Sequence, residues 1–152
     1  MGVADTGGAG ARLASCVRLT PHTSEMLVTG VDIVEIARVK SVAKRHGDRF
    51  LKRVYTEGEA YYCRGRAPQL ASRFAAKEAV MKALGTGARG VSWREIEVVR
   101  ARGGPPNIRL HARALARAQF LGIEHLALSL SHSQDFAVAS VVGESLRPPD
   151  AR

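Results

Sequence analysis

"RFAAKEAVMKALGTG", residues 73–87, predicts a helix that is apolar on one face and small on the other. At about 100° per residue, the large apolar side chains fall on one arc, as they do in a helix that faces a core: Phe74, Val80, Met81 and Leu84. The opposite face would let another backbone approach closely, because its residues are small: Ala75, Ala79 and Ala83. Gly85 is the expected end of the helix, since glycine readily takes the left-handed conformation that closes helices.

Three charged residues lie in this helix. Lys77 falls inside the apolar arc, whereas Glu78 and Lys82 lie together at its edge, four residues apart and therefore neighbours on the helix surface. One interpretation is structural, with a surface ion pair and a lysine whose stem is buried while its ammonium reaches water. The other is functional, with a carboxylate and an ammonium at the rim of a cleft. This stretch alone leaves both open.

The rest of the chain predicts elements in the order β, α, α, α, β, β, α, β, β. The expected elements are a strand from 26 that ends near Asp32, helices at 35–46, 55–63 and 73–84, a hairpin at 96–111, a helix at 112–122 and a terminal hairpin at 125–142. Hairpins without regular βαβ alternation favour an α+β fold, in which a largely antiparallel sheet packs with helices in a single domain.

Two further polar residues stand where packing alone would not require them. Asp32 closes an apolar strand, and His132 lies at the tip of the last hairpin. Each also has a structural explanation: Asp32 and Glu35 have the spacing of a helix capping box, and His132 suits a solvated turn. Thr56 and Glu59 repeat the capping-box spacing.

A chain of 152 residues with 45% hydrophobic content is enough for one core. Residues 1–25 are rich in Gly, Ala, Ser and Thr without a sustained period, which predicts a disordered N-terminal extension. The domain is expected at 26–145, and 146–152 is expected to be a loose tail.

The chain carries a formal net charge of +9, from 23 Lys and Arg against 14 Asp and Glu. Such a surface attracts nucleic acid, phosphate-bearing small molecules or an acidic protein, so a small basic nucleic-acid-binding domain is the alternative function. There are only two cysteines, Cys16 and Cys63, no zinc-ligand spacing and no apolar run that could span a membrane. We therefore expect a soluble, cytoplasmic protein.

Four segments together carry a resemblance to a known family: "GVDIVEIARV" at 30–39, "RFAAKEAVMKALGTG" at 73–87, "WREIEV" at 93–98 and "LSLSH" at 128–132. In order and spacing they resemble the small holo-[acyl-carrier-protein] synthases among the 4'-phosphopantetheinyl transferases. The resemblance covers about residues 27–143. It implies transfer of phosphopantetheine from coenzyme A to a serine of an acyl carrier protein, which serves fatty acid biosynthesis, with release of 3',5'-ADP.

The resemblance also implies roles for individual residues. Asp32 and Glu78 would hold Mg²⁺, an ion that commonly takes one or two carboxylates and completes its shell with water and substrate phosphates. Lys82 would lie near the pyrophosphate and, with Glu78, take part in catalysis. The coenzyme A site would be lined by Lys82 together with three further residues: Arg73, Pro106 and His132. The general base stays open between Glu78 and metal-bound water.

By the same resemblance, the basic helix with Arg38 and Arg45 would dock an acidic acyl carrier protein, and the protein would be a homotrimer with coenzyme A between neighbours. We expect no nucleic-acid or membrane partner. A non-catalytic relative that only binds coenzyme A or a carrier is a third reading, which the presence of Asp32, Glu78 and Lys82 together disfavours. Ala112 stands where such proteins commonly have glycine, so we expect a local difference in that turn.

Overall fold

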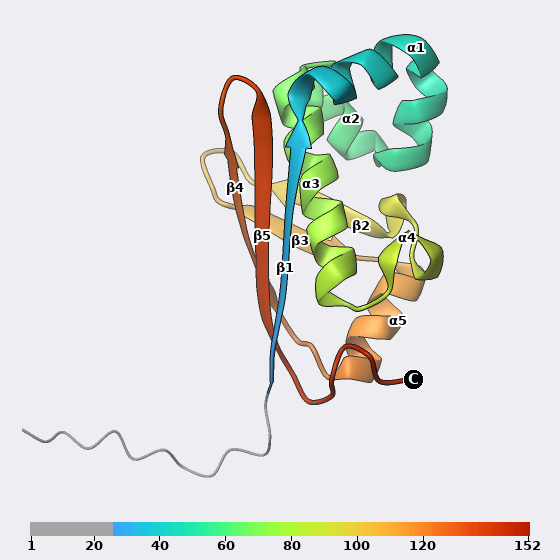
Figure 1. Ribbon diagram of the computed structural model, residues 1–152, viewed down its shortest axis with the longest axis vertical. Helices are drawn as coiled ribbons and strands as arrows, with labels where there is room; N and C mark the ends of the chain where they lie inside the picture. Colours follow the sequence, from blue (N-terminus) through green and yellow to red (C-terminus); the bar gives the residue numbers. More distant parts are fainter. Residues whose placement is uncertain (1–25) are drawn as a thin grey trace, which may run out of the picture.

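Three antiparallel strands form the main sheet, in the order β1-β5-β4 (Figure 1). The computed structural model describes residues 26–152. Strand β1 (Met26–Glu35) pairs along its whole length with β5 (Phe136–Ser145), from Met26 opposite Ser145 to Glu35 opposite Phe136. Strand β4 (Leu126–His132) flanks β5 on the other side and forms the predicted terminal hairpin with it.

A second, two-stranded sheet contains β2 (Ile96–Arg100) and β3 (Pro106–Leu110), which form the predicted hairpin through a turn at 101–105. The helical elements are α1 (Ile36–Val54), α2 (Glu57–Cys63), α3 (Ala67–Ala83), α4 (Gly87–Gly90), α5 (Ala112–Leu121) and the 3₁₀ turn η1 (Trp93–Glu95). All strand pairs among residues 26–152 are antiparallel, and the predicted α+β class is confirmed. The extension predicted at 1–25 lies outside the described residues.

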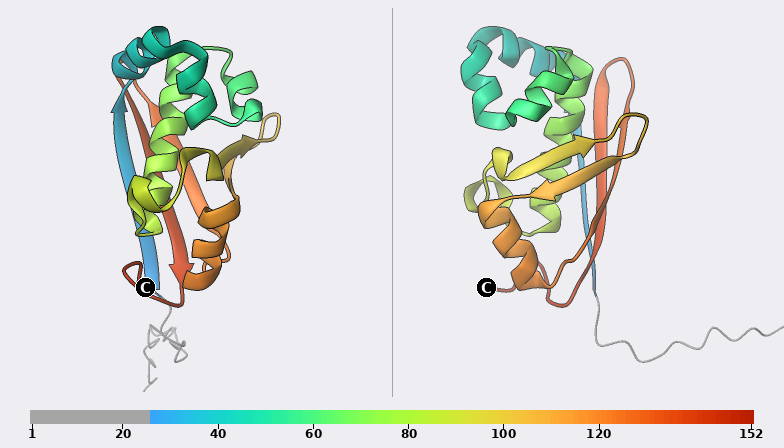
Figure 2. Two further views of the ribbon diagram at one scale, coloured as in Figure 1. Left: turned by 90° about the vertical axis from the view of Figure 1, so that its right-hand side faces the viewer. Right: turned by 180° about the vertical axis from the view of Figure 1, so that it is seen from behind.

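Helix α3 runs along one face of the three-stranded sheet, as Figures 1 and 2 show. Its small face meets β1 so closely that a Cβ atom on Gly30 would lie 1.9 Å from the Ala79 carbonyl oxygen. Only glycine permits this approach, which the alanine stripe of the sequence predicted. The close contact fixes the position of α3, and hence of its charged residues, relative to β1.

The C-terminal end of α3 closes as expected at Gly85, which has φ +67°. The Gly85 N–H donates to the Lys82 carbonyl and the Thr86 N–H to the Met81 carbonyl, each at 3.1 Å. These two bonds satisfy carbonyls that the helix end would otherwise leave unpaired.

Three predicted boundaries are wrong. Helix α3 begins at Ala67, six residues before the expected start at 73. Strand β1 continues past Asp32 to Glu35, because β5 supplies hydrogen-bonding partners along the whole segment. Glu35 is therefore the N-cap of α1, its side chain makes no capping bond, and the Asp32–Glu35 capping box does not form. Helix α1 also does not stop at Gly47, where the backbone kinks (φ +51°, ψ −133°) before the helix resumes to Val54. The Thr56–Glu59 capping box is present.

The buried core has two parts. The larger one lies between the sheet and α3, and the smaller one gathers α1, α2 and the first turns of α3 around Tyr55 and Leu70. The C-terminal residues, for which the sequence predicts a loose tail, are held to this body: Arg117 donates to the carbonyls of Pro149 at 2.5 Å and Ala151 at 2.6 Å. This end is therefore held in place rather than loose.

All helices lie on one side of the three-stranded sheet (Figures 1 and 2). Among residues 26–152, no element covers the opposite face. Large apolar side chains are exposed on β1 and β5: Leu27, Val31, Ile33, Phe136 and Val142. Leu27 is 70% and Ile33 62% exposed, which is unusual for strand residues of this size.

Candidate active site

A cavity of about 700 Å³ lies where the C-terminal end of β1 meets α1, α3 and η1. Apolar side chains of these elements form most of its wall, and polar groups are set among them: Asp32, Glu35, Arg38, Arg53, Glu78 and Trp93. A cavity of this size and mixed lining is typical of sites for small molecules and cofactors. It contains both predicted metal ligands, although Asp32 and Glu78 come from different elements.

Asp32 reaches the cavity from β1 and is paired with Lys82 of α3. The Lys82 ammonium donates to Asp32 Oδ1 at 2.9 Å and to the Val31 carbonyl at 2.8 Å. About half of the Lys82 side chain is exposed, whereas the Asp32 side chain is mostly covered. This pair places a half-exposed ammonium beside a carboxylate that lines the cavity.

Glu78 reaches the cavity from the middle of α3 and is held by Trp93. The indole N–H donates to Glu78 Oε1 at 2.6 Å. The ring stacks on Phe74, with centroids 6.0 Å apart, and the Arg53 guanidinium lies 5.9 Å from its centroid. The Glu78 carboxylate therefore has a defined orientation in the absence of any ligand.

Lys77 turns away from the cavity, which favours the structural interpretation of this residue. Its ammonium is fully buried and pairs with Glu59 at 2.7 Å. It also donates to the carbonyls of Trp93 and Ile96. Burial lowers the pKa of Lys77, and the Glu59 carboxylate opposes that shift. Lys77 and Glu78 are thus adjacent in sequence, but Lys77 points into the core and Glu78 into the cavity.

The predicted docking residues lie on α1, and both are exposed. Arg38 lines the cavity and Arg45 does not. A second arginine of α1, Arg53, also lines the cavity, so two guanidinium groups face a space that contains three carboxylates.

None of the four residues predicted at the coenzyme A site lines this cavity, although Lys82 reaches its edge through the bond to Asp32. The other three have no such contact in the part of the chain that the structure describes. Arg73 is buried beneath Tyr62, with its guanidinium carbon 4.0 Å from the ring centroid. Pro106 begins β3 in the second hairpin. His132 ends β4, exposed, with only a 3.3 Å contact from its Nδ1 to the neighbouring Ser133 carbonyl among the described residues. The structure therefore brings together Asp32, Glu78, Lys82 and Arg38 and leaves these three outside.

Sequence reasoning missed Trp93 as part of the site and Glu59 as the partner of Lys77. The contact of Trp93 with Glu78 is the shortest polar contact of the cavity wall. Trp93 opens the "WREIEV" segment, one of the four segments that carry the resemblance, and this position could have indicated a role in the site. Glu59 was assigned to a capping box, and that role is real, but it concealed the second role as partner of Lys77.

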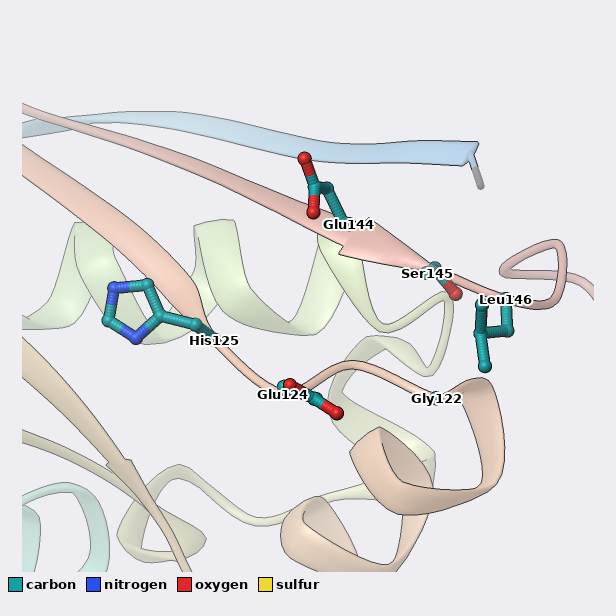
Figure 3. A pocket seen from close by; sticks show the side chains of 6 residues that line it. All are labelled: Gly122, Glu124, His125, Glu144, Ser145 and Leu146. Carbon is teal, nitrogen blue, oxygen red and sulfur yellow. The ribbon is translucent and has the colours of Figure 1, made fainter. Parts of the chain in front are cut away.

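A smaller hollow of about 260 Å³ lies at the other end of the sheet, beside Gly122 and Leu146. Glu124, His125 and Glu144 line it, but Figure 3 shows their side chains pointing in different directions. None of the predicted site residues lies there. Within residues 26–152, no three His, Cys, Asp or Glu side chains come together as a set of metal ligands.

Comparison with known proteins shows the family of the chain. A family model described as the 4'-phosphopantetheinyl transferase superfamily matches residues 29–141. The holo-[acyl-carrier-protein] synthase of Herpetosiphon aurantiacus is 53% identical over 125 residues, which cover 78% of this chain and 98% of that protein. The chain belongs to the holo-[acyl-carrier-protein] synthases. It is thus an enzyme of the 4'-phosphopantetheinyl transferase class.

Solved holo-[acyl-carrier-protein] synthases share this fold. The Helicobacter pylori enzyme, solved in complex with coenzyme A, has a TM-score of 0.69 at 34% identity and covers 76% of this chain and 98% of its own. The Bacillus anthracis enzyme, solved in complex with coenzyme A (3',5'-ADP), has a TM-score of 0.63 at 36% identity, covering 78% and 96%. Membership of this family favours a transferase over the nucleic-acid-binding alternative.

The helices of the described part of the chain are all too short or too polar to cross a bilayer.

Proposed function

We propose that this enzyme transfers the 4'-phosphopantetheine group of coenzyme A to a serine of an acidic apo acyl carrier protein, with Mg²⁺ bound by Asp32 and Glu78. Each transfer would yield one holo carrier protein and one 3',5'-ADP. The observation that carries the proposal is that Asp32 and Glu78, 46 positions apart, line the same cavity.

The residues present fit a magnesium ion. Mg²⁺ is commonly held by one or two carboxylates, with water and substrate phosphate oxygens in its other positions. Asp32 and Glu78 supply two carboxylates, and each uses one oxygen in a hydrogen bond within the protein. When bound, the ion would neutralise the negative charge that builds on the pyrophosphate during the reaction.

The chain's own groups account for the remaining steps of the transfer. The serine oxygen of the carrier forms a bond to the phosphorus that bears pantetheine, and the bond from that phosphorus to the bridging oxygen breaks. 3',5'-ADP leaves with that oxygen. The serine proton passes to Glu78 or to a water molecule in the cavity. Lys82 would move from Asp32 to the pyrophosphate, where its charge stabilises the transition state.

Coenzyme A as donor is supported by the relatives solved in complex with it. In this chain, we propose that Lys82, Arg73, Pro106 and His132 contribute to its site. Arg73 has a buried Nε–H without a hydrogen-bond partner among the described residues, as expected of a group kept for an anion. Contact with coenzyme A would require Tyr62 to move off the guanidinium.

We further propose that the active form is a homotrimer with the donor site between neighbouring chains. Two observations support this proposal. The open face of the sheet exposes apolar side chains that a second copy could cover. Pro106 and His132 lie outside the cavity of their own chain, as expected if a site is completed across an interface.

The carrier protein would approach over α1. Arg38 and Arg53 face the cavity, and Arg45 extends the basic surface along the helix. An acidic partner would be steered to this surface at low ionic strength, and added salt would slow its association.

One assay tests the proposal directly. The enzyme is incubated with coenzyme A, Mg²⁺ and an apo carrier protein, and the mass of the carrier is followed. We expect addition of one phosphopantetheine, its loss with EDTA and its recovery on adding Mg²⁺. Glu78→Gln should lower kcat at least about a hundredfold, because a bound metal contributes several kcal/mol of charge stabilisation.

Glu124→Gln is the matched control, since this exposed carboxylate lies between α5 and β4, at the end of the sheet away from the cavity. It should transfer at the wild-type rate. Transfer that survives thorough metal removal would contradict the metal-dependent mechanism. Absence of transfer to every apo carrier tested would contradict the proposed acceptor.

A further inference from the structure

Two consecutive residues of α3, Lys77 and Glu78, form hydrogen bonds with Trp93. The Glu78 carboxylate accepts its indole N–H at 2.6 Å. The Lys77 ammonium donates to its backbone carbonyl at 2.9 Å. One residue of α3 thus fixes the ring of Trp93 and the preceding residue fixes its backbone.

The ring itself has little freedom. Phe74 stacks against one side of it, with an interplanar angle of 29°. Phe74 and Glu78 are four residues apart and therefore adjacent on the surface of α3. The indole consequently lies along α3: its ring stacks on Phe74, and its N–H binds Glu78 one turn later.

This arrangement is anchored in the core by an ion pair. Lys77 and Glu59 have no exposed side-chain surface. The second oxygen of Glu59 accepts the backbone N–H of Val98 at 2.9 Å. A buried pair of this kind is costly to disturb, because removal of one partner leaves the other charge unpaired. The chain of contacts Glu59–Lys77–Trp93–Glu78 therefore connects rigid core to cavity.

The chemistry of the indole decides what its contact with Glu78 can do. An indole N–H is a donor only and cannot bind a cation. Its bond to a carboxylate is charge-assisted and geometrically specific. It occupies Oε1 of Glu78 and leaves Oε2 free of the indole. The indole therefore orients the carboxylate through Oε1, and Oε2 can bind a ligand.

We propose that Trp93 is a positioning residue that orients the Glu78 carboxylate for the metal ion, with Lys77 and Glu59 as its support. The proposal rests on the proposed function, in which Glu78 is a metal ligand. Groups that orient metal ligands in this way commonly contribute tenfold to a hundredfold to metal affinity.

Because Trp93 is the only tryptophan of the chain, it also reports directly on this contact. In the full chain with coenzyme A but no carrier protein, no transfer can occur, and Mg²⁺ is titrated while tryptophan emission is recorded. We expect a saturable change in emission. Sodium chloride at matched ionic strength is the control and should give none.

The matched variant is Trp93→Phe, which keeps an aromatic ring against Phe74 and removes the N–H donor. We expect calorimetry to show Mg²⁺ binding at least about tenfold weaker, with a similar rise in the Mg²⁺ concentration for half-maximal transfer. The thermal unfolding midpoint should stay close to that of the wild type. A role in packing alone would show the reverse, a lower midpoint with unchanged Mg²⁺ binding, and would overturn the proposal.

The experiment separates this proposal from the one on which it rests. If Mg²⁺ binds the wild type but leaves the emission unchanged, and Trp93→Phe binds it equally well, Trp93 has no positioning role and the metal site stands. If Glu78→Gln binds Mg²⁺ as tightly as the wild type does, the metal site itself is wrong, and the proposal for Trp93 falls with it.

Discussion

Ala112 has a backbone conformation that alanine rarely adopts, with φ +44° at the start of α5. A left-handed conformation costs a residue with a Cβ atom about 1–2 kcal/mol. The resemblance noted above places a glycine at this position in related proteins. Ala112→Gly should therefore raise the free energy of unfolding by roughly 1 kcal/mol, as measured by urea denaturation.

Ala116→Gly provides the control, because Ala116 is exposed on the same helix and has an ordinary φ. Glycine there should lower the free energy of unfolding by about 1 kcal/mol. If both substitutions destabilise the protein equally, Ala112 is not strained.

The residues of the site could be predicted only in part. Asp32, Glu78 and Lys82 stood out because a motif carries them and because polar groups interrupt apolar patterns. The partners of Lys77 could not be predicted, since helical periodicity gives the face of a residue and not what packs against it. Its contacts to Glu59 and Trp93 connect positions 18 and 16 residues away and depend on the tertiary fold.

Glu97 of β2 forms hydrogen bonds with residues of two other segments. It accepts hydrogen bonds from Thr56, which caps α2, at 3.0 Å and from His111, which precedes α5, at 2.9 Å. Burial tends to raise the pKa of Glu97, but the hydrogen bonds from His111 and Thr56, together with the charge of Arg109, outweigh it and lower the pKa below its usual value of 4.5.

This shift predicts how stability depends on pH. Because the folded state holds Glu97 ionised more strongly than the unfolded state does, the contribution is present above pH 4.5 and is lost as the pH falls through the lower, folded-state pKa. Glu97→Gln should therefore lose less stability on acidification than the wild type, as measured by urea midpoints above and below pH 4.5. Glu144→Gln should retain the wild-type dependence, and an unchanged slope in Glu97→Gln would contradict the linkage.

The order and type of the elements could be predicted because apolar periodicity and glycine positions are local signals. Three boundaries could not be predicted, and two of them show the reason. Strand β1 extends to Glu35 only because β5 pairs with it, and α1 continues beyond Gly47 because its last turns pack Leu51 and Val54 into the smaller core. In both cases a tertiary contact overrides the local signal.

We expect the uncovered face of the sheet to determine how copies of the chain associate. Val142 lies on the central strand β5 and is 42% exposed. Val142→Asp would place a charge in the centre of the proposed interface, where desolvation is costly. We expect light scattering after gel filtration to show a trimer for the wild type and a smaller species for the variant, with transfer activity reduced in parallel.

Leu115→Asp is the matched control, because Leu115 is 43% exposed but lies on α5, away from that face. It should remain trimeric. A monomeric Val142→Asp enzyme with undiminished transfer would show that the donor site does not need a neighbouring chain.

Whole-molecule features were the least accessible to prediction. The convergence of Asp32 and Glu78 on one cavity depends on the contact of Gly30 with Ala79. The small face of α3 predicted that a backbone would approach it closely, but not which one. The resemblance predicted that Asp32 and Glu78 act together. The packing of Gly30 against the backbone of α3 explains physically how the two residues reach one cavity.

The anchoring of the chain end by Arg117 has a practical consequence for anyone who engineers this enzyme. The Pro149 carbonyl lies so close to Gly85 that a Cβ atom there would be 2.1 Å away, and the same arginine also binds the Leu84 carbonyl. The C-terminal residues thus pack against the loop that follows α3. A purification tag or fusion partner attached there would pull on the end of α3 next to Lys82, so a long spacer belongs between the two.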